Sequence, residues 1–178
     1  HVAFAVIVDG EGQIVFSTGD PHYLTCIRSS LKPFQAAASV KAGAVDAACF
    51  DEKELALMCA SHKGEDIHVD TASSMINKLD LNIDDFECGS HYPSDTITRH
   101  KMIRENEVAT ALHNNCSGKH AGMLALAKHL GAETKGYINE EHPVQRIILE
   151  YVAELSGESD IPTETDGCSA PTPFMTLK

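Results

Sequence analysis

The sequence predicts an α+β fold in a single domain that covers residues 1–178. Three observations support this prediction: a strand-like apolar pattern near the N-terminus, helix-like spacing through the middle, and a length of 178 residues, which suits one hydrophobic core. We find no internal repeat and no linker rich in Pro, Gly or Ser that would divide the chain.

The N-terminal segment predicts a β-hairpin. Apolar residues at 2–8 and 14–16 flank a turn sequence at 9–12 that contains two glycines. Since two strands alone are marginally stable in water and leave their edges unpaired, we expect further strands to complete the sheet.

The middle of the chain predicts helices, because apolar residues recur there at helical spacing. Asp51 and Glu54 are typical of a helix start, and Pro143 suits a first helical turn. Gly131 and Gly157 are typical of helix ends. The predicted helices cover residues 31–40, 55–60, 67–79, 119–130 and 143–155.

Two segments lack a regular period. Gly89, Pro93 and many polar residues interrupt residues 84–106, so we expect a loop with short helical turns that lines a site. Residues 161–178 also predict a loop. Because no further strand is expected before Lys178, we expect the chain to be the N-terminal part of a longer protein.

Composition narrows the range of partners and locations. A net charge of −12 disfavours nucleic acid and anionic membranes, which attract clustered Lys and Arg. The longest apolar stretches are far shorter than the ~20 residues that cross a bilayer. Six scattered cysteines indicate reduced thiols, and no secretory signal is evident, so we expect a cytoplasmic protein.

The first candidate for chemistry is the S-x-x-K sequence formed by Ser29 and Lys32. Pro33 suits the first turn of a helix, which places Ser29 and Lys32 on one face. A desolvated lysine can take the proton of a serine nucleophile. The pattern is short, however, and on spacing alone the plainer interpretation is that Ser29 caps the helix and Lys32 is solvated.

A second candidate nucleophile is Ser61, which directly follows a predicted apolar helix. Gly64 permits a sharp turn there, which would present the serine to a cavity. No lysine in this segment is an obvious base for it. The alternative is that Ser61 ends the helix and residues 62–66 form a solvated loop.

The third candidate is a metal site. Cys116 and Lys119 are spaced to place a thiolate beside an amine, and Cys168 would bring a second thiolate from far along the chain. Two thiolates and a nitrogen suit zinc, with one position open to water or substrate. On spacing alone a polar helix start with Cys116 buried is the plainer interpretation, and the Gly-Lys dipeptide fails the phosphate-loop pattern.

Five segments taken together resemble the asparaginase II family, which includes the inducible, thermolabile rhizobial L-asparaginase. The match runs in order along nearly the whole chain, and the sequence Cys-Ser-Gly-Lys-His is its most specific part. The segments are residues 29–35, 61–65, 88–93, 115–124 and 166–171.

The resemblance implies deamidation of L-asparagine to L-aspartate and ammonia by two Ser-Lys pairs near a zinc site. It also implies a fold similar to that of serine β-lactamases and penicillin-binding proteins. The site residues that it implies are Ser29, Lys32 and Ser61 for catalysis, Cys116, Lys119 and Cys168 for zinc, and Arg28, His120 and Asp166 for contacts with the substrate.

The resemblance further implies that this chain is the N-terminal half of a cytoplasmic homodimeric enzyme, and that the lysine partner of Ser61 lies in the later half. Two other functions stay open. A serine acyl hydrolase of the β-lactamase type would account for S-x-x-K, although its S-D-N and K-T-G motifs are missing. A non-catalytic fragment that binds zinc or another ligand is the other alternative.

Overall fold

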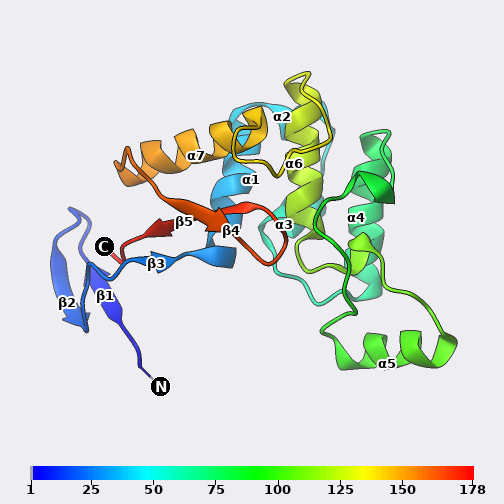
Figure 1. The fold of residues 1–178 in the computed structure, drawn as a ribbon, viewed down its shortest axis with the longest axis horizontal. Helices are drawn as coiled ribbons and strands as arrows, with labels where there is room; N and C mark the ends of the chain where they lie inside the picture. Colours follow the sequence, from blue (N-terminus) through cyan, green and yellow to red (C-terminus); the bar gives the residue numbers. More distant parts are fainter. Residues whose placement is uncertain (1) are drawn as a thin grey trace.

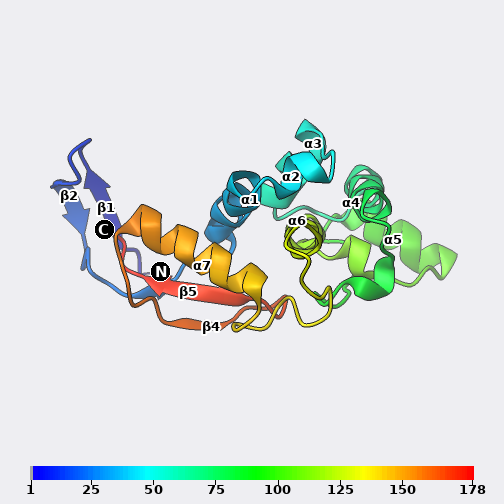
Figure 2. The same cartoon turned by 90° about the horizontal axis from the view of Figure 1, so that it is seen from above.

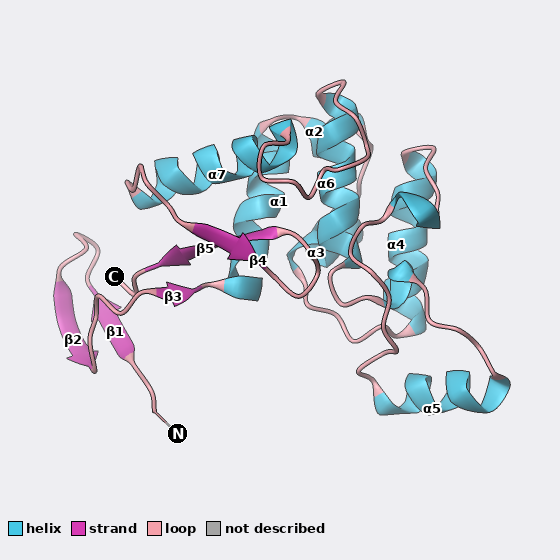
Figure 3. Ribbon diagram, in the orientation of Figure 1, coloured by secondary structure: helices cyan, strands magenta, loops and turns pink. Residues whose placement is uncertain are grey.

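The structure, a computed structural model, describes residues 2–178. Over that range it combines seven α-helices with two small antiparallel sheets, which confirms the predicted α+β class (Figure 1, Figure 3). No helix in the described part of the chain is long and apolar enough to cross a membrane.

The predicted hairpin is present. Strands β1 (Ala5–Val8) and β2 (Ile14–Thr18) pair antiparallel, and the Asp9 carboxylate accepts two backbone N–H groups of the turn between them. The hairpin lies at the opposite end of the molecule from α5 (Thr96–Glu105; Figure 2), and most of its apolar side chains are exposed. It therefore contributes little to the core.

A second sheet corrects the prediction of a loop over residues 161–178. Strand β5 (Pro171–Met175) lies between β3 (Thr25–Cys26) and β4 (Thr163–Thr165), antiparallel to both. Two of the five residues of β5 are prolines, which donate no hydrogen bond and argue against a central strand. That composition is the reason why the sequence concealed this strand.

Most of the predicted helices begin and end close to the residues expected from the sequence. The helix start predicted at Asp51 and Glu54 is a capping box with reciprocal side-chain and backbone hydrogen bonds, and Gly157 ends the last helix in the left-handed conformation. The helices besides α5 are α1 (Lys32–Lys41), α2 (Ala44–Ala47), α3 (Glu52–Cys59), α4 (Asp66–Lys78), α6 (Ser117–His129) and α7 (Pro143–Ser156), with 3-10 turns η1 (Arg28–Leu31), η2 (Ile83–Asp85) and η3 (Ala111–His113).

Helix α5 corrects the prediction of a loop over residues 84–106. The Asp95 side chain accepts hydrogen bonds from the backbone and hydroxyl of Thr98, and Asn106 ends the helix in the left-handed conformation. Of the helix residues only Met102 is buried, so the sequence lacks the apolar stripe by which a helix is recognised.

Helix α6 is the centre of the fold, packed against α1, α2, α3 and α4. Its first eleven residues are all buried, from Ser117 to Ala127. A Cβ atom at Gly118 would lie 2.3 Å from the carbonyl oxygen of Leu57, so glycine is what allows α6 to approach α3 this closely. This contact brings the start of α6 beside the segment that follows α3.

Candidate active site

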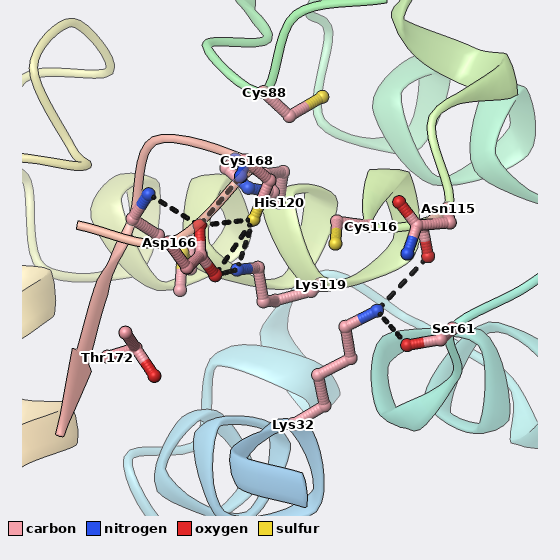
Figure 4. Close-up of polar contacts among 12 residues, drawn as sticks. Lys32, Ser61, Cys88, Asn115, Cys116, Lys119, His120, Asp166, Cys168 and Thr172 are labelled. Atoms are coloured by element: carbon pink, nitrogen blue, oxygen red, sulfur yellow. Dashed lines mark hydrogen bonds and ion pairs between the residues drawn. The ribbon is translucent and has the colours of Figure 1, made fainter. Parts of the chain in front are cut away.

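The structure brings Lys32 and Ser61 together. Lys32 is the first residue of α1 and is 2% exposed. Its Nζ atom donates to Ser61 Oγ at 2.9 Å and to the carbonyl oxygen of Asn115 at 3.1 Å (Figure 4), and also to the carbonyl oxygen of Ala60 at 2.6 Å. Three segments that are distant in the sequence thus meet at one amine.

The protonation state of Lys32 decides what this contact can do. Burial lowers the pKa of Lys32 below its ordinary value, although Cys116 opposes that shift. A neutral amine has two protons and one lone pair, and the carbonyl oxygens of Ala60 and Asn115 can only accept. When Lys32 loses a proton, the two carbonyls can keep the two remaining amine protons, and the lone pair then faces the Ser61 hydroxyl.

Ser61 itself is exposed, directly after the C-terminal end of α3, so a substrate can reach it. Ser29, which the spacing paired with Lys32, is also exposed and lies in the 3-10 turn before α1. The structure thus places a lysine of this chain, Lys32, beside Ser61, whereas the resemblance implied a lysine partner for Ser61 in the later half of a longer protein.

The residues of the predicted metal site also gather in one place. Lys119 Nζ lies 2.7 Å from Cys168 Sγ and 3.1 Å from Asp166 Oδ2. The Asp166 carboxylate accepts the backbone N–H groups of Cys168 and Ala170, which fixes the turn between β4 and β5. Cys116 lies between this cluster and the Lys32–Ser61 pair (Figure 4).

The residues of this cluster shift one another's pKa values in opposite directions. A hydrogen bond from Cys168, together with the nearby Lys119 and Lys32, lowers the pKa of Cys116 to about 6 against the effect of burial. The same bond raises the pKa of Cys168. Burial disfavours the charge on Lys119, but Cys168 and Asp166 outweigh it and raise the Lys119 pKa. These directions favour a thiolate at Cys116, a thiol at Cys168 and an ammonium at Lys119.

The donor set of this cluster fits zinc only if Lys119 is a ligand. Within residues 2–178 no group of three or more His, Cys, Asp or Glu side chains is arranged to hold a metal ion. Cys116 and Cys168 supply two sulfurs, and Lys119 would supply a nitrogen after losing a proton.

The two remaining predicted residues have different surroundings. Arg28 is exposed and has a φ of 47°, in the left-handed region. His120 is fully buried, with Nδ1 2.8 Å from the Tyr137 hydroxyl and no partner for Nε2 in the described part of the chain. Substrate contacts for Arg28, His120 and Asp166 stay predictions.

Sequence reasoning missed two groups at the site. The Asn115 carbonyl binds Lys32, and the buried ring of His62 contacts Ser117 at the start of α6. Asn115 directly precedes Cys116, and His62 directly follows Ser61. This adjacency to candidate site residues is the feature of the sequence that could have identified them.

A serine hydroxyl beside a desolvated lysine is a pair of groups from which a hydrolase can build an activated nucleophile. The family model described as L-asparaginase II matches residues 1–178, the whole length of the chain. The chain therefore belongs to the L-asparaginase II family and is an amidohydrolase of the asparaginase type. A search of curated proteins found no match.

Proposed function

We propose that this chain carries the Ser-Lys machinery of an L-asparaginase, with Ser61 as the nucleophile and Lys32 as its general base. The observation that supports this most directly is the 2.9 Å contact between Lys32 Nζ and Ser61 Oγ, flanked by two carbonyls that orient the amine. The lowered pKa of Lys32 increases the neutral fraction that can accept a proton.

In the proposed reaction Ser61 Oγ bonds to the side-chain amide carbon of L-asparagine as its proton passes to Lys32 Nζ. The C–N bond then breaks, and the proton on Lys32 moves to the leaving nitrogen, which departs as ammonia. Water attacks the resulting ester, giving its proton to Lys32, and releases L-aspartate while the proton returns to Ser61. Ser29 remains the second candidate nucleophile, and Arg28, His120 and Asp166 the candidate contacts for the substrate.

We also propose that Cys116, Lys119 and Cys168 hold zinc. A bound zinc ion would supply a Lewis acid beside the site. The support is the donor set, two sulfurs and a nitrogen, together with the carboxylate of Asp166 3.1 Å from Lys119.

The remaining expectations are proposals on the same footing. The exposed apolar side chains of the β1–β2 hairpin form a surface that further protein would cover. They support the proposal that residues 1–178 are the N-terminal part of a longer enzyme. We propose that this enzyme is a homodimer with a β-lactamase-like fold. The six free cysteines support a cytoplasmic location. Solution mass tests the dimer.

The experiment is ammonia release from L-asparagine and L-glutamine by the intact protein and its Ser61→Ala variant, with β-lactam hydrolysis measured in parallel. We expect asparagine turnover that the Ser61→Ala change abolishes. Full turnover by Ser61→Ala would exclude Ser61 as the nucleophile. Hydrolysis of β-lactams alone would favour the acyl hydrolase alternative, and zinc binding without any turnover the non-catalytic one.

A further inference from the structure

His62, the residue after the exposed Ser61, is buried, with 5% of its surface accessible. Its Nδ1 atom accepts the N–H of Gly64 at 3.1 Å, which leaves the proton of the neutral ring on Nε2. That Nε2 lies 2.8 Å from Ser117 Oγ and donates to it. The tautomer of His62 is therefore fixed by its two partners.

The partners of His62 tie the Ser61 segment to the start of α6. Ser117 is the first residue of α6 and is fully buried. The backbone N–H of His62 also donates to the Asn115 carbonyl at 3.2 Å, the carbonyl that accepts from Lys32. The same short segment before α6 thus fixes both Lys32 and the backbone that carries Ser61.

The conformation around His62 leaves its ring little freedom. Gly64 has a φ of +77°, and a Cβ atom there would lie 3.0 Å from the His113 carbonyl and 3.1 Å from Pro93. The His62 ring also stacks on that of His68, with centroids 5.0 Å apart. Burial, together with the nearby His68 and Lys32, lowers the pKa of His62 to about 4, so the ring is neutral at physiological pH.

We infer that His62 is a positioning residue, which holds Ser61 against Lys32 by fastening the Ser61 segment to Ser117. The inference rests on the proposed function, because it assumes that Ser61 is the nucleophile. His62 acts through its neighbours, since its ring nitrogens are both engaged by protein partners. A displacement of about 1 Å at a nucleophile costs on the order of 100-fold in rate, which sets the scale of the effect.

The test compares two substitutions at His62, one that can keep the hydrogen bond to Ser117 and one that can keep only the hydrogen bond from Gly64. A glutamine amide nitrogen takes the place of Nε2 and can still donate to Ser117, whereas the shorter asparagine reaches only the position of Nδ1. We expect His62→Asn to lower kcat for asparagine by about 10- to 100-fold with KM changed less than about 3-fold, and His62→Gln to restore most of that loss. His129→Asn, at the far exposed end of α6, is the matched control.

Ser117→Ala removes the partner instead and gives an independent answer. We expect a loss of kcat similar to that of His62→Asn, and no further loss when the two changes are combined. Wild-type kcat in folded His62→Asn or in Ser117→Ala would overturn the inference, as would equal activity of His62→Asn and His62→Gln. If His62→Asn fails to fold, Ser117→Ala decides alone.

The same measurements separate this inference from the proposed function. An active Ser61→Ala protein would show that Ser61 is not the nucleophile and would overturn both. An inactive Ser61→Ala protein beside a fully active His62→Asn protein would overturn the positioning role alone.

Discussion

The Nζ atom of Lys32 lies 2.9 Å from the Oγ atom of Ser61, although 29 positions separate the two residues in the chain. Lys32 begins α1 and Ser61 follows α3, and both helices pack against α6. The distance between the two side chains therefore depends on how closely α1 and α3 pack against α6.

Replacing Lys32 by methionine should remove the general base and keep most of the aliphatic side chain. We expect Lys32→Met to lower kcat/KM for L-asparagine by about 10²- to 10⁴-fold. Lys32→Arg should not restore the rate, because a guanidinium stays protonated. Steady-state ammonia release measures both, and a Lys32→Met protein with wild-type kcat/KM would show that Lys32 is not the base.

The close approach of α6 to α3 can be tested by stability. Gly118→Ala places a Cβ atom 2.3 Å from the Leu57 carbonyl oxygen, so we expect the free energy of unfolding to fall by about 1–3 kcal/mol, despite the higher helix propensity of alanine. Gly10→Ala is the control, because its Cβ meets nothing within 4 Å and its φ is not positive. Urea denaturation measures both, and equal stability of the two variants would contradict the packing described.

Zinc content tests the proposed metal site. We expect Cys116→Ser and Cys168→Ser each to weaken zinc binding by at least about 10-fold, because each removes a thiolate ligand. Binding should also release protons, since Lys119 must become neutral to coordinate. Elemental analysis after dialysis gives the stoichiometry. The exposed Cys49→Ser is the matched control, and full zinc content in a Cys116→Ser, Cys168→Ser double variant would exclude the site.

The buried His62 predicts a loss of stability in acid. Its pKa is about 4 in the folded protein against 6.5 for a free imidazole, so between these values the unfolded chain binds more protons. The neutral His62 therefore contributes to the free energy of unfolding above pH 6.5, and this contribution is lost as the pH falls to about 4. The loss is about 2–3 kcal/mol. His113 and His120 act in the same direction, because burial also lowers their pKa values.

Comparison with His62→Gln isolates the share of His62 in that loss. The glutamine side chain does not titrate, whereas the titratable groups around position 62, namely Lys32, His68, His91 and His113, are unchanged. We expect the variant to lose about 2–3 kcal/mol less than the wild type between pH 7.5 and 4 in urea denaturation. Parallel losses in the two proteins would contradict the assignment of a neutral, buried His62.

Most of the fold could be predicted because its signals are local. The capping box at Asp51 and Glu54 and the stop at Gly157 mark helix ends that the structure has in the same places. Helix α5 lacked an apolar stripe, and β5 contains prolines, so each was hidden by the absence of the pattern that usually reveals such an element.

The candidate site was less predictable, because its partners are chosen by tertiary packing. Spacing related Lys32 to Ser29, whereas the folded chain turns the lysine to Ser61 and to the carbonyl of Asn115. Cys168 was grouped with Cys116 and Lys119 as a candidate metal ligand by residue type, but its contact with Lys119 at 2.7 Å depends on the turn between β4 and β5. The family resemblance named these residues, but their contacts come from the structure.

The measurement that tests the central claim most directly is the site of acylation. The intact protein is mixed with L-asparagine, quenched rapidly in acid, digested and mapped by mass spectrometry, with Ser61→Ala and Ser29→Ala proteins in parallel. The account predicts an aspartyl ester on the peptide that contains Ser61, present in Ser29→Ala and lost in Ser61→Ala. An ester on Ser29 that persists in the Ser61→Ala protein would contradict it.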